Sequence, residues 1–285
     1  MSLSSLLRRI LRPFLGRGLF GKPGLRRLAS LFSRLYHPEY VEFEGRTLYL
    51  NPNDPIVGKA IMLHGSYEPM ETEYVRRSVS PGDTVVDVGA HIGYFTLLLS
   101  SLVGPDGKVY ALEPDPENFR YLQKTVAALP ERNVELHHVA AWKREEMLPW
   151  HRSGSNPGDH SLLAGEGRTT TEQVEARRLD SIIPPGTVVD FLKVDVQGAE
   201  GGVLDGMARL LDEGQPRRML LEFMPSQIRA AGYDPGEIFG MLLNRGYAIR
   251  MISEYGGIDE PVDAYESIDR LCTEDWRFVN LFCER

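Results

Sequence analysis

A buried strand that runs into a glycine turn is the feature that most constrains how this chain can fold. The stretch is TVVDVGAHIGYF, residues 84–95, in which Val85, Val86 and Val88 predict a strand covered on both faces. Gly89 and Gly93 let the chain turn sharply and approach a neighbouring group without Cβ interference. A helix expected from residue 94 would point its N-terminus at whatever occupies the turn. The stretch therefore predicts the first strand, turn and helix of a parallel α/β sheet.

Short Val-rich apolar runs alternate with longer helical patterns through the rest of the chain, which is typical of successive βαβ units. We expect strands at 84–88, 108–112, 134–140, 188–194, 218–223, 247–252 and 278–283. We expect helices at 94–102, 116–129, 199–212 and 235–244, the last with Asp234 as its N-cap and Pro235 at its first position. The predicted fold class is α/β, a Rossmann-like, seven-stranded and mostly parallel sheet flanked by helices.

The organisation of the chain follows from its size and from one long gap between strands. With 285 residues and 42% hydrophobic content the chain can bury a full core, so we expect one domain over 81–285, after a cover segment at 36–80. Residues 143–187 form an insertion whose polar SGSNPGDHS stretch and alternating TTTEQVEARRL stretch predict an inserted strand or hairpin. An insertion of this length is usually functional or mobile, and it could line the acceptor site.

Residues 1–35 form a basic arm with an apolar stripe at helical spacing. Eight Lys and Arg and no Asp or Glu occur there, so the rest of the chain carries a net charge of −16. Such an acidic body argues against nucleic-acid binding. Leu3, Leu7, Ile10 and Phe14 share one helix face, which fits either a helix lying on an anionic membrane surface or one docked on the domain. No apolar run approaches the ~20 residues that span a bilayer.

The cysteines indicate the compartment. Cys272 and Cys283 are the only two in the chain, and they lack the spacing of a zinc site. This sparse usage is typical of a reducing compartment, so we expect a cytoplasmic protein, with membrane association at the inner face if the arm binds lipid.

Two acids belong with the glycine turn. Asp87 lies inside the first strand, where an unpaired carboxylate would be costly, so it should accept hydrogen bonds from the turn or from a bound ammonium group. Glu113 ends the second strand, where an acid suits bidentate hydrogen bonding to two ribose hydroxyls. The turn is not the dinucleotide fingerprint GxGxxG, because His91 occupies its second glycine position.

A third group of polar residues follows the fourth strand, in FLKVDVQGAE at 191–200. Lys193 and Asp195 flank Val194 and share one face of the strand. Asp195 therefore lies where ligands of open α/β sheets bind. Glu200 falls in the first turn of the next helix, where it serves either the helix dipole or the site.

The ordered motifs resemble those of the FkbM family of S-adenosylmethionine (SAM) dependent methyltransferases over roughly two thirds of the chain. The matching stretches are GSYEPMETEYV from residue 65, VVDVGAHIGYF, ALEPDPENFRYL, ARRLDSI, KVDVQGAEGGVLDG and LLEF, which ends at residue 223. The resemblance implies a class I methyltransferase fold, in which the seventh strand runs antiparallel. It implies methyl transfer from SAM, commonly to a hydroxyl of a sugar, glycolipid, polyketide or similar metabolite.

The resemblance also assigns cofactor contacts by position. Asp87, Gly89 and Gly93, with Ala90 in the same turn, would hold the methionine part of SAM, and Glu113 its ribose. Family members often have Asn or Gly in place of His91. Many class I enzymes have an acid after the third strand that contacts the adenine amine, but HHVAAW contains none. Backbone groups from Val139 to Ala141, centred on Ala140, are the expected substitute.

Methyl transfer to a hydroxyl needs alignment of the reacting atoms and a group that takes the hydroxyl proton. We expect Asp195 to be this general base or an orienting group, with His91 second and Glu222 third. His91 could instead hydrogen-bond the backbone of its own turn. Tyr67 and Glu68 could cover the edge of the cofactor. We assign no metal, because spacing supplies no third ligand beside Asp195 and Glu222, and His160 is only a possible one.

Other functions fit parts of the pattern. One is a nicotinamide-dependent oxidoreductase, although the missing third glycine and Asp87 inside the strand argue against it. Another is a non-enzymatic, membrane-associated SAM-binding protein, although the expected cofactor acids and glycines are all present. A third is methyl transfer to nitrogen. The sequence does not define the oligomeric state.

Overall fold

The computed structural model describes residues 38–52, 54, 56–153, 160–164, 168–253, 256–274 and 277–285. The basic arm expected at 1–35 lies outside these residues. Among the described residues, no helix combines the length and apolar character needed to cross a membrane.

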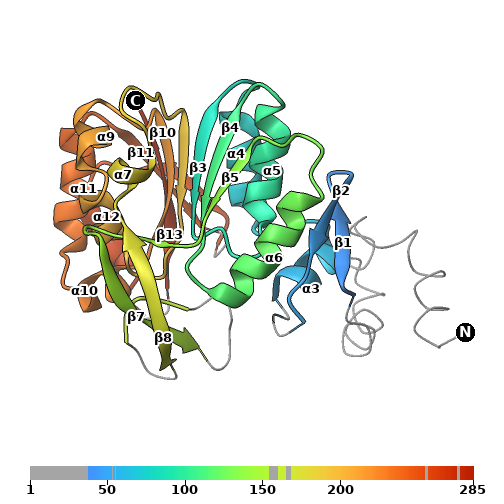
Figure 1. The fold of residues 1–285 in the computed structure, drawn as a ribbon. Helices are drawn as coiled ribbons and strands as arrows, with labels where there is room; N and C mark the ends of the chain where they lie inside the picture. Colours follow the sequence, from blue (N-terminus) through green and yellow to red (C-terminus); the bar gives the residue numbers. More distant parts are fainter. Residues whose placement is uncertain are drawn as a thin grey trace, which may run out of the picture.

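An eight-stranded sheet forms the centre of the fold (Figure 1), in the order β12-β11-β13-β10-β9-β3-β4-β5. Its strands are β3 (Thr84–Val88), β4 (Lys108–Leu112), β5 (Val134–His137), β9 (Phe191–Val194), β10 (Arg218–Phe223), β11 (Ala248–Ser253), β12 (Ile258–Pro261) and β13 (Val279–Glu284). The five neighbours from β10 to β5 pair in parallel, whereas β13 lies antiparallel between β10 and β11. This is the expected class I arrangement, extended by β12 as an antiparallel edge strand.

Helices cover both faces of this sheet because its strands are apolar on both sides. In β10, Leu220 belongs to one apolar cluster, and Met219 and Leu221 belong to the other. Since neighbouring residues of a strand point to opposite faces, these clusters are the two cores of the domain. The helices are α3 (Ile56–His64), α4 (Pro69–Ser78), α5 (Tyr94–Val103), α6 (Pro116–Ala127), α7 (Leu179–Ile182), α8 (Glu200–Asp205), α9 (Ala208–Asp212), α10 (Pro225–Ala230), α11 (Pro235–Asn244) and α12 (Tyr265–Leu271).

A small second sheet, built mainly from the insertion, lies beside the main one. Its strands are β6 (Ala140–Ala141), β7 (Glu146–Ser153) and β8 (Arg168–Arg177), in the order β6-β8-β7. β7 and β8 are antiparallel, as expected of a hairpin. The strand predicted at 134–140 is wrong beyond His137, because the chain leaves the main sheet there and β6 pairs with β8 instead.

The helix predicted at 199–212 is also wrong as a single element, because it divides into α8 and α9 at Gly206. A Cβ on Gly206 would lie 2.1 Å from the carbonyl oxygen of Trp142. The break therefore lies where the chain that follows β6 packs directly on the helix backbone. By contrast, α11 begins as predicted, with Asp234 as N-cap and Pro235 after it.

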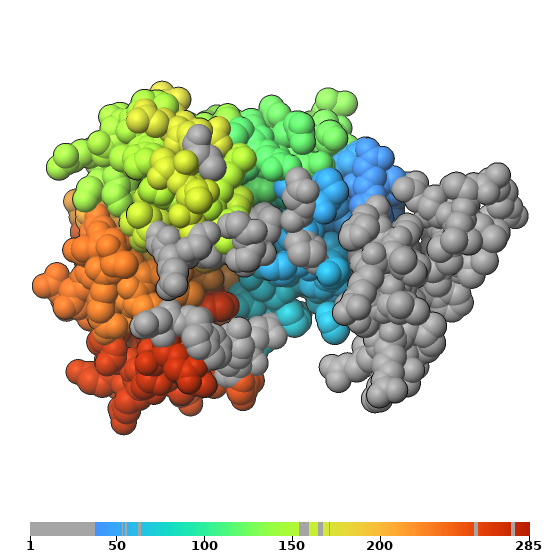
Figure 2. All heavy atoms as spheres, turned by 90° about the horizontal axis from the view of Figure 1, so that it is seen from below, coloured from blue at the N-terminus to red at the C-terminus, as the bar shows by residue number. Residues whose placement is uncertain are grey.

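Residues 38–80 pack on the domain as two short strands and two helices. β1 (Tyr40–Phe43) and β2 (Arg46–Tyr49) form an antiparallel pair. The amide of Tyr49 donates to the hydroxyl of Thr125 in α6. The space-filling view shows this segment, in blue and cyan, against the green central part of the chain (Figure 2).

Candidate functional site

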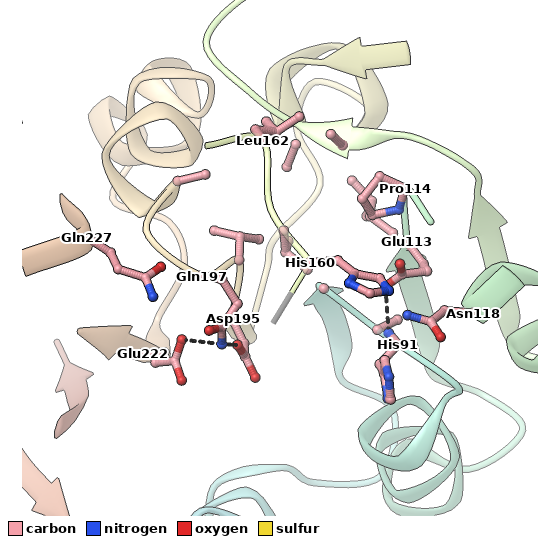
Figure 3. A pocket seen from close by; sticks show the side chains of 18 of the residues that line it. His91, Glu113, Pro114, Asn118, His160, Leu162, Asp195, Gln197, Glu222 and Gln227 are labelled. Carbon is pink, nitrogen blue, oxygen red and sulfur yellow. Dashed lines mark hydrogen bonds between the residues drawn. The ribbon is translucent and has the colours of Figure 1, made fainter. Parts of the chain in front are cut away.

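A cavity of about 790 Å³ lies at the carboxyl ends of the central strands. Its wall includes most of the site residues expected from the sequence, namely Gly89, Ala90, His91, Glu113, Ala140, Asp195 and Glu222. Figure 3 shows two groups of side chains facing each other across it. We call them the β4 side, with His91, Glu113, Pro114, Asn118 and Ala140, and the β9 side, with Lys193, Asp195, Gln197, Glu222 and Gln227.

The glycine turn joins the two sides through a close backbone contact. Gly89 has a φ of +84°, and a Cβ on it would lie 1.9 Å from the carbonyl oxygen of Asp195. The amide of Asp195 in turn donates to the carbonyl of Val88 at 3.0 Å. Glycine is therefore required here by the neighbouring strand end as well as by the turn.

Two expected cofactor residues do not line the cavity. Asp87 is fully buried in β3, where one carboxylate oxygen accepts the hydroxyl of Thr96 at 2.6 Å. Burial raises the pKa of Asp87, although the nearby Lys193 ammonium opposes this rise. Gly93 is the N-cap of α5. Both residues therefore support the conformation of the turn without facing the cavity.

Glu113 presents a buried carboxyl group to the β4 side. Its Oε2 accepts the amide of His91 at 2.7 Å, and its Oε1 accepts the amide of Asp115 at 2.9 Å. Burial raises the pKa of this group to about 8 despite these two backbone donors. Each oxygen of an ionised carboxylate offers two lone pairs, so each can accept one more donor, as two neighbouring hydroxyls would require.

His91 connects the turn to the N-terminal segment. It has a φ of +53°, in the left-handed region that Asn and Gly adopt more readily. This explains why Asn or Gly suits the position. The Nε2 atom of His91 lies 3.7 Å from Oδ2 of Asp54, and burial lowers the pKa of its imidazole although Asp54 opposes this. His91 is placed beside Glu113, across the cavity from Asp195 (Figure 3).

Apolar and backbone groups complete the β4 side. Pro114, Asn118, Val139, Ala140 and Ala141 all line this part of the cavity. No acid follows β5, as the sequence indicates, so the stretch from Val139 to Ala141 would present small apolar side chains to a flat ring. His160 and Leu162, from the insertion, lie over the same part of the cavity (Figure 3).

A hydrogen-bonded chain of polar side chains forms the β9 side. Nζ of Lys193 lies 2.9 Å from Oδ2 of Asp195. Nε2 of Gln197 donates to Oδ1 of Asp195 at 3.0 Å and to Oε2 of Glu222 at 2.8 Å. Gln197 therefore fixes the two acids relative to each other.

The acids of the β9 side differ in charge. Burial opposes ionisation of Asp195, but the Lys193 ammonium and the hydrogen bonds hold its pKa below the ordinary value. Burial and the charge of Asp195 raise the pKa of Glu222 well above its ordinary value, and burial raises that of Glu68 to about 8. At neutral pH the charged Asp195 carboxylate therefore lies near two acids, Glu222 and Glu68, whose raised pKa values favour the protonated form.

Several of these contacts are not indicated by the sequence. Gln197 and Asp115 appear in the motifs but carry no distinguishing spacing, and Asp54 belongs to a distant segment. Glu200 does not line the cavity; its Oε1 accepts the amide of Gly198 at 3.0 Å. In the part of the chain that the structure describes, no three His, Cys, Asp or Glu side chains are grouped to hold a metal ion.

The cavity fits a nucleoside that carries an amino-acid chain. The Glu113 carboxyl group suits two ribose hydroxyls, the wall from Val139 to Ala141 suits a flat base, and the turn at Gly89 and Ala90 lines the cavity between the β4 side and the β9 side. Pockets of this kind are mostly apolar with a few placed polar groups. SAM has this composition.

Several known methyltransferases are similar to this chain. 31-O-demethyl-FK506 methyltransferase FkbM of Streptomyces tacrolimicus is 27% identical over 210 residues, 62% of this chain and 77% of that protein. Methyltransferase 1 of Beauveria bassiana is 28% identical over 149 residues, 45% of this chain and 59% of that protein. The crystal structure of methyltransferase FkbM from Methylobacillus flagellatus KT aligns with 92% of this chain and 60% of its own, at 16% identity and a TM-score of 0.45.

These alignments cover only part of some of the similar proteins. The chain spans less than two thirds of the length of the fungal relative and of the crystallised protein. The family model of the methyltransferase FkbM domain, in contrast, matches residues 87–249, more than half of this chain. The match begins at Asp87 and includes Glu113, Asp195 and Glu222. The chain therefore belongs to the FkbM family of SAM-dependent methyltransferases.

Proposed function

We propose that this protein methylates a hydroxyl oxygen of a sugar, glycolipid or related small metabolite, with Asp195 as the group that takes the hydroxyl proton. The observation that carries the proposal is the charged Asp195 carboxylate in the cavity wall, held by Lys193 and Gln197. The family match favours a methyltransferase over the nicotinamide-dependent oxidoreductase that the sheet alone would allow.

The residues of the β4 side would hold SAM. Glu113 would accept the ribose hydroxyls, Gly89 and Ala90 would face the methionine part, and Ala140 would lie along the adenine, with Asp87 and Gly93 supporting the turn. Bound SAM supplies an electrophilic methyl group on a sulfonium sulfur.

Asp195 is a weak base, and a weak base is sufficient here. As the acceptor oxygen forms its bond to carbon, its proton becomes strongly acidic, and the Asp195 carboxylate accepts it. Lys193 keeps Asp195 charged until then, and the protonated Glu222 offers a hydrogen-bond donor to the acceptor. Burial lowers the pKa of the His91 imidazole and so weakens it as a base, and His91 lies across the cavity from Asp195, so we rank it second to Asp195 as a proton acceptor.

A hydroxyl-rich acceptor suits the rest of the β9 side. Arg168, Ser226 and Gln227 line the cavity there and supply polar groups of both kinds. The two protonated acids and the Lys–Asp pair carry no net charge between them, and they add hydrogen-bond donors and acceptors that suit several hydroxyls. The only two cysteines are free, which supports a cytoplasmic location.

Labelled SAM tests the proposal. The purified protein is incubated with methyl-labelled SAM and a cell extract separated into lipid, glycan, small-molecule, nucleic-acid and protein fractions, with Asp195→Asn as the control. We expect label in the glycan, lipid or small-molecule fraction, stable to alkali as a methyl ether is, and absent with the variant. Label confined to protein or nucleic acid, label released by alkali as methanol, or no label in any fraction would each overturn it.

A further inference from the structure

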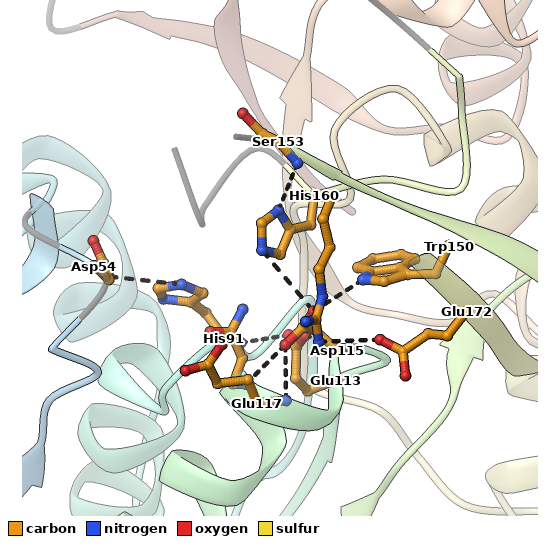
Figure 4. Close-up of polar contacts among 11 residues, drawn as sticks. Asp54, His91, Glu113, Asp115, Glu117, Trp150, Ser153, His160 and Glu172 are labelled. Carbon is orange, nitrogen blue, oxygen red and sulfur yellow. Dashed lines mark hydrogen bonds and ion pairs between the residues drawn. The ribbon is translucent and has the colours of Figure 1, made fainter. Parts of the chain in front are cut away.

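Asp115 makes two different sets of contacts, one with each carboxylate oxygen (Figure 4). It is the N-cap of α6, and its Oδ1 accepts the amides of Glu117 at 2.8 Å and Asn118 at 3.0 Å. Its side chain is buried, with an exposed fraction of 1%. A helix cap needs only one of the two oxygens.

The second oxygen of Asp115 contacts the insertion. Oδ2 accepts Nε1–H of Trp150 at 3.0 Å and Nε–H of Arg152 at 2.8 Å. Both residues belong to β7, and Arg152 also pairs with Glu172 of β8 at 3.0 Å. One carboxylate oxygen thus holds the hairpin against the start of α6.

His160 adds to this attachment. Its Nδ1 accepts the amide of Ser153 at 3.0 Å, so in the neutral ring the proton is on Nε2. Nε2 lies 3.9 Å from Oδ2 of Asp115. Burial opposes ionisation of Asp115, but hydrogen bonds from Asn118 and Trp150 and the charge of Arg152 keep its pKa below the ordinary value.

The same part of the insertion crosses the cavity. Residues 160–164, which we call the crossing segment, contribute His160, Leu162, Leu163 and Ala164 to the cavity wall. At the other side, the hydroxyl of Ser161 donates to the carbonyl of Gln197 at 3.0 Å. The crossing segment therefore runs from Asp115 on the β4 side to Gln197 on the β9 side.

We propose that Asp115 is a positioning residue for SAM, because it fastens the crossing segment over the part of the cavity where Glu113 lies. The amide of Asp115 donates to Glu113 and its carboxylate holds Trp150 and Arg152, so one residue joins the ribose acid to the insertion. Without this attachment, the apolar groups that shield the nucleoside from water would lose their position.

Asp234 provides a matched control. It caps α11 as Asp115 caps α6, with Oδ1 accepting two amides, from Gly236 at 2.7 Å and Glu237 at 3.2 Å, and with proline next in the sequence. It does not line the cavity. Asn caps helices as well as Asp, so Asp115→Asn and Asp234→Asn keep both helix starts. Only Asp115→Asn places an amide group against the donors of Trp150 and Arg152.

The experiment measures SAM affinity by calorimetry and trypsin cleavage after Arg168 by mass spectrometry, in the full chain. We expect Asp115→Asn to raise the Kd for SAM about tenfold and to speed cleavage, because a charged acceptor of two hydrogen bonds is lost. We expect Asp234→Asn to leave the Kd for SAM and the cleavage rate within about twofold of those of the unchanged protein, since it loses no contact with the insertion.

Equal SAM affinities and equal cleavage rates for the two variants would overturn the proposal. If Asp115→Asn does not fold, Arg152→Met replaces it, because Arg152 touches Asp115 but does not line the cavity. Arg152→Met should weaken SAM binding about threefold and speed cleavage, since the charged hydrogen bond to Asp115 is lost together with the ion pair to Glu172. Unchanged affinity and cleavage in Arg152→Met would overturn the proposal equally.

Discussion

The two sides of the cavity hold their acids by different means. On the β4 side, Glu113 is held by two backbone amides, one from the glycine turn and one from the start of α6. On the β9 side, Asp195 and Glu222 are held by the side chains of Lys193 and Gln197. A backbone donor follows from the fold, whereas a side-chain donor depends on one residue. The difference suits a constant ligand on the β4 side and chemistry on the β9 side.

Asp195→Asn is expected to have the largest effect, and it tests whether chemistry on the β9 side is separate from SAM binding on the β4 side. Loss of the proton acceptor should lower turnover about 10²- to 10⁴-fold, while the Kd for SAM stays within about twofold. The measurement is kcat with the identified acceptor alongside the calorimetric SAM affinity. Wild-type turnover would remove Asp195 from the chemistry, and lost SAM affinity would show that the two sides are not separable.

Glu113→Gln should weaken SAM binding and leave turnover nearly unchanged, the reverse of Asp195→Asn. Its amide nitrogen would face a backbone N–H, and above the Glu113 pKa of about 8 the charge that accepts the ribose hydroxyls would also be lost, so the Kd for SAM measured above that pH should rise about 10- to 100-fold. Turnover at saturating SAM should change little. In the unchanged protein, affinity should increase as pH rises through the Glu113 pKa of about 8, because the ionised group accepts both hydroxyls. A variant with the same pH dependence would contradict this role.

Glu222→Gln should have a small effect at pH 7. Burial and the Asp195 charge raise the pKa of Glu222, so a neutral amide of the same shape replaces a neutral acid. We expect kcat within about threefold of the unchanged protein, with Asp195→Asn measured alongside. A loss as large as that of Asp195→Asn would show that Glu222 works as the charged group.

The last expected effect concerns stability without SAM. The pKa of Glu113 is raised from 4.5 to about 8, so between these values the folded protein holds a proton that the unfolded chain has lost. The free energy of unfolding contributed by this group is therefore present below pH 4.5 and is lost as pH rises to 8. Glu113→Gln cannot titrate, so its Tm should fall less than that of the unchanged protein between pH 5 and 8. Parallel Tm profiles would contradict the assignment.

The sequence predicts those parts of the fold whose contacts are local. The bounds of β3, β4 and β10 agree with prediction to the residue, because each is a short apolar run between turn residues. The break between β5 and β6 was missed, because the apolar pattern continues while the chain changes its partner strand. The division at Gly206 was missed for the same reason, since Trp142 comes from a distant segment.

In the candidate site, too, the sequence predicts the residues whose position depends on local structure. Glu113 and Asp195 could be placed because each follows a recognisable strand, and open α/β sheets bind ligands there. The second contact of Asp115 could not, since Trp150 lies 35 residues further along the chain in an insertion without a motif. The signal available was only a helix cap, which Asp234 carries as well.

The contact between Gly89 and Asp195 has a consequence for redesign of the enzyme. Because a Cβ on Gly89 would lie 1.9 Å from the Asp195 carbonyl, backbone atoms set the spacing between the glycine turn and Asp195, the proposed proton acceptor. The insertion at 143–187 takes no part in that contact. A chimaera that exchanges the insertion for that of a relative should therefore keep its reactive geometry while its choice of acceptor changes.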